Sequence, residues 1–206
     1  MSRPTQDRQI RMNEILDAAD KLFFSNGYNA TTISDIAQKI GVAQGMLYYY
    51  FKSKEEVLER LLDRYAADLV ADIKAIYIKN NTSTEKIVFI LAATLNKACY
   101  KNGLLLNMLY DVHNIHIKEK LFNQLELSLK PWLTKIVEEG IEAGEFEVFH
   151  APTAAEYILV IVDFLSASIY KKTSDEILSY HIRMAEMLIG KALGAKENSI
   201  HIEFTG

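Results

Sequence analysis

Residues 31–54 of the chain read TTISDIAQKIGVAQGMLYYYFKSK, and this stretch decides the fold. Apolar side chains at helical spacing predict two short helices, over residues 33–40 and 44–51. Gly41 supplies the turn between them, with a backbone conformation that other residues adopt only at a cost. Two short helices joined by a three-residue turn form a helix-turn-helix, a motif whose second helix enters the major groove of DNA.

The side chains of this stretch divide into an inner and an outer set. Ala37 is small, so the second helix can cross closely over the first. The inner set, which holds the two helices at a fixed angle, is Ile36, Ile40, Val42 and Leu47. The outer set, which is free to face a partner, is Gln44, Gly45, Tyr48 and Tyr49. The spacing alone also fits two packed core helices without any DNA role.

Residues around this stretch extend the pattern to about 45 contiguous positions. They are the first helix, which ends in Asn26-Gly27-Tyr28, and then Ala30–Thr32, Asp35–Ala37, Gly41-Val42 and Gly45–Glu55. This combination resembles the amino-terminal domain of the tetracycline-repressor (TetR) family of transcription regulators. Further along, Gly140-Ile-Glu-Ala-Gly144-Glu145-Phe146 resembles the end of the family's seventh helix. The resemblance implies an all-helical homodimer, with three helices for DNA and about six for an effector pocket and the dimer interface.

Helical periodicity continues along the chain and predicts an all-α fold of about nine helices with no sheet. Pro131 is expected to kink or split the helix that contains it. Residues 199–204 alternate as a strand would, but a single strand has no partner, and they also fit a flexible end. The helices are expected at about residues 8–26, 33–40, 44–51, 54–79, 83–101, 104–113, 116–143, 153–171 and 175–194. We therefore expect a helix-turn-helix domain, residues 1–54, and an effector-binding and dimerisation domain, residues 55–206.

Capping signals mark the starts of two of these helices. Thr32-x-x-Asp35 resembles a capping box with a short acid, in front of the first helix of the motif. Ser53-Lys54-Glu55-Glu56 is a fuller capping box, and it opens the long helix that follows the motif.

The composition of the 206 residues limits the function classes. Half of the residues are hydrophobic and 24% are charged, which suits a folded, soluble protein. The single cysteine, Cys99, excludes an internal disulfide framework and a four-cysteine metal site. The first residues lack the apolar region of a secretory signal, and no uncharged apolar stretch reaches about 18 residues, so we expect a cytoplasmic protein with no membrane partner. No nucleotide-binding or hydrolase motif occurs, so we expect no enzyme activity, metal or cofactor.

The recognition segment departs from the family's usual pattern. Ala43 stands where the family often has Ser or Thr, Gln44 where Lys or Arg is frequent, and Met46 where Thr is frequent. No Lys or Arg lies between positions 40 and 51, so this helix cannot make a bidentate guanine contact. Gln44 can pair with adenine, and Met46 or Tyr49 can pack on a thymine methyl. We therefore expect A·T-rich half-sites in a palindromic double-stranded operator.

Other residues are expected to contact phosphates. By analogy with the family, Tyr48 and Tyr50 place their hydroxyls at the DNA backbone, although either also fits a half-buried core position. Lys54 and Thr32 each stand at a helix start, where the side chain and the helix end can meet a phosphate together. The complete expected DNA-binding set is Thr32, Gln44, Gly45, Met46, Tyr48, Tyr49, Tyr50, Lys52 and Lys54.

The net charge of −4 hides an asymmetry along the chain. Residues 1–54 carry seven Lys and Arg against five Asp and Glu, whereas the rest carries 16 against 22. This difference permits nucleic-acid contact at the amino-terminal end, although ordinary fluctuation also produces it. Arg3, Arg8 and Arg11 either supply the charge that the recognition helix lacks or are the solvated residues of an exposed helix.

The resemblance places an effector pocket among the central helices. Aromatic and Met residues at helical spacing are more often plain core, so each candidate keeps both interpretations. Cys99 is expected to be a buried, small apolar residue rather than a redox sensor. His113-x-x-His116 offers half of a metal site, but no second ligand pair accompanies it. The candidate ligand contacts are Tyr77, Phe89, Cys99, Met108, Tyr110, His113, Trp132, Tyr157 and Phe164.

The last two expected helices, over residues 153–171 and 175–194, carry paired apolar seams. Such seams suit a four-helix bundle formed by two chains, although they also fit packing within one chain. The candidate interface residues are Tyr157, Ile161, Phe164, Leu178, His181, Ala185 and Leu188.

Three hypotheses follow from the sequence. The first is a DNA-binding repressor that a small apolar or aromatic effector releases from its operator, through different affinities for two states of the dimer. The second is an enzyme that uses the same helical pocket, against which stands the absence of catalytic motifs. The third is a helical binding protein whose DNA domain has degenerated, as Ala43 and Gln44 faintly indicate.

Overall fold

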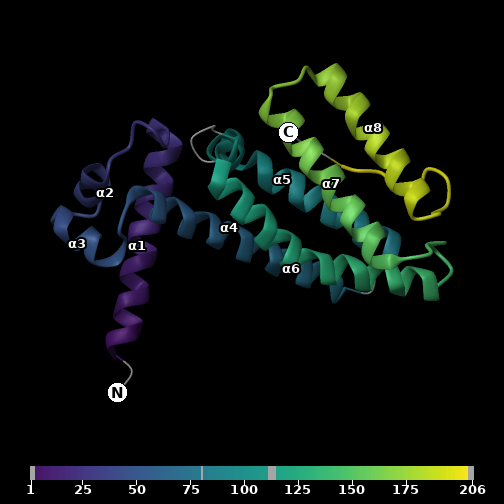
Figure 1. Cartoon of the computed structure of the whole chain (residues 1–206), viewed down its shortest axis with the longest axis horizontal. Helices are drawn as coiled ribbons and strands as arrows, with labels where there is room; N and C mark the ends of the chain where they lie inside the picture. The colour runs from purple at the N-terminus through teal and green to yellow at the C-terminus, as the bar shows by residue number, and fades with distance from the viewer. Residues whose placement is uncertain (1–2, 80, 111–114, 204–206) are drawn as a thin grey trace. The chain divides into compact units, whose positions relative to one another are not determined.

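The structure is a computed structural model, and it describes residues 3–79, 81–110 and 115–203. Within these ranges, the side chains of residues 3–7, 100–105, 107–109, 116 and 121 are not described. The described residues form eight helices and no strand, so the expected all-α class is confirmed (Figure 1). The chain divides into two compact units, residues 1–65 and 66–206. This division falls inside a helix, and the functional boundary after residue 54 stays a prediction.

The first unit contains α1 (Arg3–Asn26), α2 (Ile33–Lys39), α3 (Gln44–Tyr50) and the first part of α4 (Lys54–Tyr77). Figure 1 shows α2 and α3 on one side of α1. One apolar core holds these helices together because each contributes fully buried side chains to it. The largest of them are Ile15, Phe23, Ile36, Leu47, Phe51, Leu58, Leu61 and Leu62.

The turns of the first unit follow the sequence signals. Gly27 and Gly41 both have positive φ, at +84° and +71°, a conformation that glycine adopts without strain. Thr32 caps α2 and forms the predicted capping box with Asp35. At the start of α4, the Ser53 hydroxyl accepts the predicted bond from the Glu56 amide, at 3.1 Å. The Glu56 carboxylate accepts instead from the amide of the exposed Lys52, so only half of that box has the expected partner.

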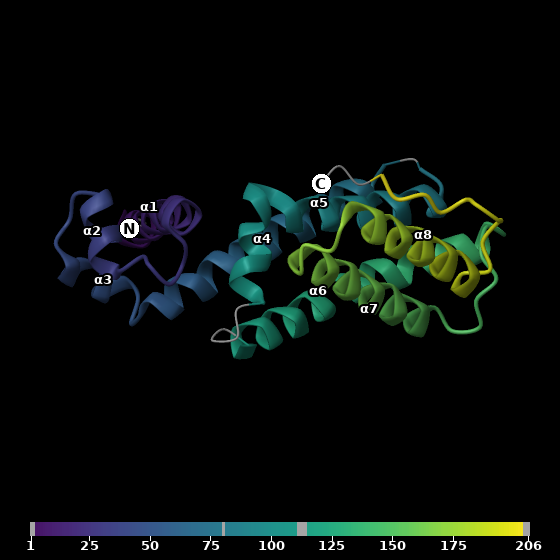
Figure 2. The ribbon, with the colours of Figure 1, turned by 90° about the horizontal axis from the view of Figure 1, so that it is seen from above.

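The second unit is built around α7 (Ala151–Tyr170), which packs against the other three long helices of the unit. These are α5 (Ser83–Leu109), α6 (Ile115–Glu142) and α8 (Asp175–Ala192). Figure 2 shows α7 and α8 side by side. By length and composition α7 could cross a membrane, and one third of that apolar window is buried. Its packing on three helices accounts for the buried part of this apolar surface.

Two expected interruptions of helices do not occur. The predicted helices over 83–101 and 104–113 form the single helix α5, which passes through Gly103. A glycine inside a helix costs only about 1 kcal/mol, which tertiary packing easily exceeds. Pro131 lies inside α6 without splitting it. The carbonyl that loses its partner belongs to Leu127, which is 78% exposed, so water can satisfy that group. The continuous α5 corrects the break expected near Gly103, and of the kink or split expected at Pro131, the split does not occur.

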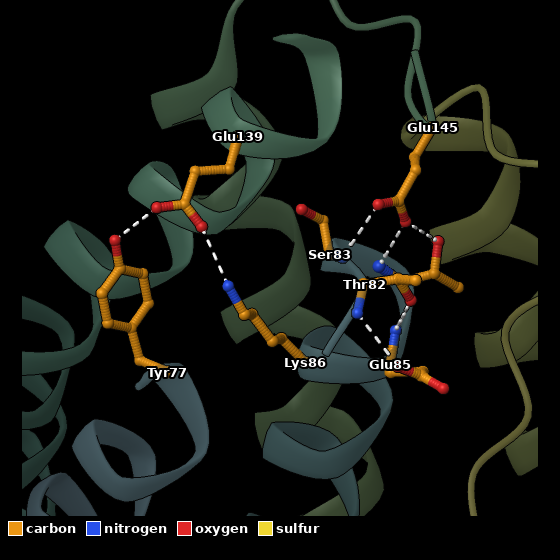
Figure 3. A network of polar contacts seen from close by, with 8 residues as sticks. Tyr77, Thr82, Ser83, Glu85, Lys86, Glu139 and Glu145 are labelled. Carbon is orange, nitrogen blue, oxygen red and sulfur yellow. Dashed lines mark hydrogen bonds and ion pairs between the residues drawn. The ribbon is translucent and has the colours of Figure 1, made fainter. Parts of the chain in front are cut away.

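The segment after α6 joins two helices of the second unit, α5 and α6. Phe146 packs directly on Gly140, where an added Cβ would lie 2.1 Å from the Phe146 ring, so no larger residue fits there without movement. The Glu145 carboxylate accepts hydrogen bonds from the amides of Ser83 and Thr84, at 3.0 and 2.9 Å (Figure 3). Burial alone would raise the pKa of Glu145, but these bonds outweigh it and lower the pKa. The Gly-Glu-Phe sequence therefore fixes α5 against the end of α6.

The residues after α8 are packed rather than free. They run back along α8 (Figures 1 and 2). Ile200 and Ile202 are each 4% exposed, whereas His201 and Glu203 between and after them are exposed. The Ile202 amide donates to the Glu186 carboxylate at 2.8 Å. The alternation in the sequence therefore reflects an extended segment with one buried face, and that face covers the core beside α8.

Candidate nucleic-acid interface and effector region

Helix α3 is anchored on one side and open on the other. Leu47 and the following Phe51 are at most 1% exposed, so they fix the helix in the core of the first unit. Met46, Tyr48 and Tyr49 are 42%, 52% and 71% exposed. Large apolar and aromatic groups of monomeric proteins rarely gather on one exposed face without a partner. The structure thus places these three side chains outward, together with the exposed Gln44 and Gly45.

The start of α3 lacks a side-chain cap. Ala43 occupies the N-cap position and makes no side-chain hydrogen bond, as its sequence position predicts. Tyr50, at the other end of α3, is half-buried, and its ring packs edge-on against Tyr49 with 5.1 Å between the centroids. The Tyr49 ring is therefore exposed to solvent and also in contact with the Tyr50 ring of the same helix.

Lys54 makes contacts that differ from the predicted phosphate contact. Its Nζ donates to the carbonyl oxygens of Tyr28 and Thr31 at 2.8 Å each, and to that of Asn29 at 3.3 Å. It also lies 4.4 Å from the centroid of the Tyr28 ring. An ammonium has three donors, and all three point to backbone carbonyls here. Lys54 thus ties the start of α4 to the segment between α1 and α2.

Thr32 also uses its hydroxyl within the chain. The hydroxyl donates to Asp35 Oδ2 at 2.7 Å and accepts from the Asp35 amide at 3.1 Å. The hydrogen bond from the Thr32 side chain lowers the pKa of the Asp35 carboxyl, and the bond from the Thr32 amide adds to this effect. A hydroxyl has a single donor, so Thr32 must exchange this bond before it can donate to a phosphate.

One contact beside α3 has no signal in the local sequence. The guanidinium carbon of Arg8, on α1, lies 5.8 Å from the centroid of the exposed Tyr49 ring. Arg11, one turn further along α1, is paired with Glu14 at 2.5 Å. The tertiary arrangement therefore brings one of the three arginines considered from the sequence next to the recognition helix.

Two of the candidate effector residues whose side chains are described contact each other directly. Tyr77 and Trp132 form an edge-on pair with centroids 5.2 Å apart, and the Tyr77 hydroxyl donates to Glu139 (Figure 3). Phe89 is 43% exposed. Cys99 is half-buried, and burial raises the pKa of its thiol, which agrees with a structural role rather than a redox role. The side chain of Met108 and all of His113 lie outside the described residues.

Tyr110 belongs to a separate polar and aromatic group. Its ring stacks on that of Tyr170 with 5.0 Å between centroids, and its hydroxyl donates to Asp163 Oδ1 at 2.8 Å. Burial, together with this carboxylate, raises the pKa of the Tyr110 hydroxyl. Lys118 Nζ lies 3.8 Å from the Tyr110 ring centroid and 3.9 Å from Asp163 Oδ1. Sequence reasoning missed Lys118, Asp163 and Tyr170, because their partners lie on different helices.

The outer faces of α7 and α8 expose a row of large apolar side chains. Two of the expected interface residues, Tyr157 and Phe164, are 62% and 53% exposed. Ile161, Leu178 and His181 are half-buried, and the ring of His181 packs on that of Phe164 with 5.0 Å between centroids. Ala185 is buried within its own chain, so it has no surface to offer a partner. The exposed row is Tyr157, Val160, Phe164, Ile177, Tyr180, Met184, Met187 and Leu188.

Metal ligation finds no support in the described part of the chain. No group of three or more His, Cys, Asp or Glu side chains there is arranged to hold a metal ion. The sequence His113-x-x-His116 falls outside the described side chains.

Comparison with known proteins gives a consistent set of relatives. Residues 15–61 match the family model of bacterial regulatory proteins of the tetR family. The fatty acid metabolism regulator protein of Bacillus subtilis is 26% identical over 144 residues, which are 69% of this chain and 74% of that protein. Among solved structures, the fatty acid degradation regulator FadR from Bacillus halodurans superposes with a TM-score of 0.68, at 22% identity, over 90% of this chain and 97% of that chain. FadR from Bacillus subtilis in complex with stearoyl-CoA superposes with a TM-score of 0.66, at 23% identity, over 91% of this chain and 98% of that chain.

A helix-turn-helix with an anchored and outward-facing second helix, followed by an all-helical second unit, defines a DNA-binding transcription regulator. Residues 15–61 of this regulator match the TetR family of bacterial regulators, and a regulator protein of Bacillus subtilis is similar over 69% of the chain.

Proposed function

We propose that the protein is a dimeric repressor, and that an effector with a long apolar chain releases it from its operator. The observation that carries the DNA-binding part is the exposed face of α3 on a rigidly packed motif. The relatives it matches are regulators of transcription, and the chain has no catalytic motif, so we propose no enzymatic role. A DNA-binding regulator acts where the chromosome is, so we place it in the cytoplasm.

The second copy of the chain is proposed to cover the exposed row on α7 and α8. Tyr157, Val160 and Phe164 recur at helical spacings of three and four, so they form one stripe along α7. Met184, Met187 and Leu188 continue the apolar surface on α8. A two-fold axis would place identical stripes against each other and present two identical recognition helices to the DNA. The half-sites would then lie about one helical turn, or a multiple of it, apart.

The effector class is proposed from the relatives and from the apolar character of the second unit. A relative by sequence regulates fatty acid metabolism, and a structural relative was solved with stearoyl-CoA. Several predicted contact residues here are aromatic side chains that are only half-buried, such as Tyr77, Tyr110 and Trp132. A long-chain acyl thioester is therefore the first effector to test, within the wider class of apolar ligands.

A mobility-shift titration separates these parts of the proposal. The protein is titrated onto the DNA upstream of its own coding sequence, without addition and with stearoyl-CoA, stearate or CoA. We expect a specific complex that stearoyl-CoA dissociates and that CoA alone leaves intact. A complex that none of the three compounds affects would reject the acyl effector, while the DNA-binding function would stand. If no specific complex forms on any promoter fragment, the chain fits better a helical binding protein with a degenerate DNA domain.

A further inference from the structure

The recognition helix lacks a positive charge, and a different helix brings one next to it. From Gln44 to Tyr50, α3 contains no Lys or Arg. Non-specific DNA affinity comes from cations at the phosphates, so a motif without them on its main helix needs another source. Lys52, two residues after α3, is exposed and lies beyond the end of the helix. Lys54, at the start of α4, has its three donors directed to backbone carbonyls.

Arg8 is the cation that the fold brings to this place. Its guanidinium carbon lies 5.8 Å from the centroid of the Tyr49 ring, within the range of a cation–π contact. Tyr49 in turn packs on the half-buried Tyr50, and this contact restricts the movement of the Tyr49 ring on which Arg8 stacks. A guanidinium that stacks on a ring keeps its N–H donors at its edge for another partner.

Arg8 and its neighbour Arg11 differ in availability. Arg11 is held by Glu14 in an ion pair at 2.5 Å. Within the described side chains, Arg8 has its contact with Tyr49 but no carboxylate partner. Arg8 is also exposed, so its donors face solvent beside the outward face of α3.

Resting on the DNA-binding function above, we propose that Arg8 and Tyr49 together form a contact to a DNA phosphate beside the carboxyl-terminal end of α3. Residues at the amino-terminal end of a recognition helix meet the base edges. Tyr49 is the last residue but one of α3, so the pair lies at the opposite end of the helix. The guanidinium supplies the phosphate ligand, and Tyr49 is a positioning residue that orients it.

The test measures how the DNA affinity of the full-length protein depends on salt concentration. The variants are Arg8→Ala, Tyr49→Phe, Tyr49→Leu and the double variant Arg8→Ala/Tyr49→Leu, on one operator fragment and on a scrambled duplex. Arg8→Ala should weaken binding to both duplexes by about tenfold at moderate salt. It should also reduce the slope of log K against log salt by about 0.9, the value for one lost phosphate contact.

The Tyr49 variants test the positioning role. Tyr49→Phe retains the ring and should keep the wild-type slope, whereas Tyr49→Leu should lose most of what Arg8→Ala loses. The double variant should bind DNA about as strongly as the single variant with the lower affinity, since both changes remove the same contact. Fully additive losses would mean that the two residues act independently, and they would overturn the pairing.

Lys21→Ala is the matched control on the same helix. Lys21 is exposed, and at about 100° per residue it lies about 140° around α1 from Arg8, so its removal should leave the slope unchanged. An unchanged slope for Arg8→Ala, with normal wild-type binding, would reject this proposal alone. A loss for Arg8→Ala on the operator but not on the scrambled duplex would make Arg8 a reader of bases and equally overturn it. Absence of wild-type binding to both duplexes would instead reject the DNA-binding function.

Discussion

Lys54 Nζ donates a hydrogen bond to the carbonyl oxygen of Tyr28 at 2.8 Å, and its charge also lies 4.4 Å from the centre of the same residue's ring. The two residues are 26 positions apart, at the start of α4 and in the segment between α1 and α2. Together with the bonds to Asn29 and Thr31, this contact fixes the chain that leads into the helix-turn-helix. Lys54 therefore acts on the geometry of the motif from within the protein.

Replacing Lys54 tests this structural role. Lys54→Met keeps much of the apolar stem but leaves three carbonyls without their charged donor, so unfolding should become easier by about 1–3 kcal/mol. Lys54→Arg should not restore the loss, because a planar guanidinium does not match three converging carbonyls. Chemical denaturation followed by circular dichroism measures the change. A Met variant that is as stable as the wild type, but whose DNA affinity depends less steeply on salt concentration, would show that Lys54 contacts a phosphate instead.

Glu145 gives a prediction for the dependence of stability on pH. Its pKa is lowered in the folded protein from the ordinary value of 4.5, so the carboxylate stabilises the fold above that value. The stabilisation is lost as the pH falls below about 4.5 and through the lower folded pKa. Glu145→Gln should therefore unfold more easily than the wild type by about 1 kcal/mol at pH 7, as for a lost helix cap.

The gap between wild type and Glu145→Gln should close as the pH falls from 5 towards 3, which urea titrations across this range measure. Glu197→Gln is the control, because Glu197 is exposed on the segment after α8 and should show no such gap at any pH. A gap for Glu145→Gln that stays constant down to pH 3 would mean that its side-chain charge does not stabilise the start of α5.

Phe164 is the side chain with which to test the proposed dimer. It is 53% exposed on α7 between other exposed apolar residues, so Phe164→Asp should leave the protomer folded but place two buried charges in the interface. Sedimentation should give about twice 23.4 kDa for the wild type and a value near 23.4 kDa for the variant. Leu127→Asp, at a 78% exposed position of α6, is the control and should remain dimeric. A wild-type monomer at micromolar concentration would contradict the dimer.

Local signals in the sequence predict local structure well. The capping box of Thr32 with Asp35, the turn at Gly41 and the buried position of Leu47 all follow from residues within a few positions of one another. The helix break expected near Gly103 does not occur, because packing of the long helices outweighs the local cost of a glycine. Pro131 does not split α6.

The sequence predicts less of the candidate site, because its contacts join distant positions. The sequence around Lys54, at the start of a helix, predicts a phosphate contact. The carbonyl of Tyr28, which Lys54 binds instead, comes close to it only in the folded chain. The approach of Arg8 to Tyr49 likewise depends on how α1 crosses the motif. Ala185 has the spacing of an interface residue, but its side chain is buried within its own chain.

The central claim is that α3 reads DNA without a cation, through Gln44 and Met46 near its amino-terminal end. Selection of bound sequences from a random duplex pool tests it most directly, with wild type and Gln44→Lys side by side. The wild type should select two symmetric half-sites that are rich in A·T where α3 enters, because Gln pairs with adenine and apolar groups pack on the thymine methyl. Gln44→Lys should shift that preference towards G and raise affinity for all sequences through its added charge. A wild-type consensus dominated by G·C pairs at those positions would contradict the account.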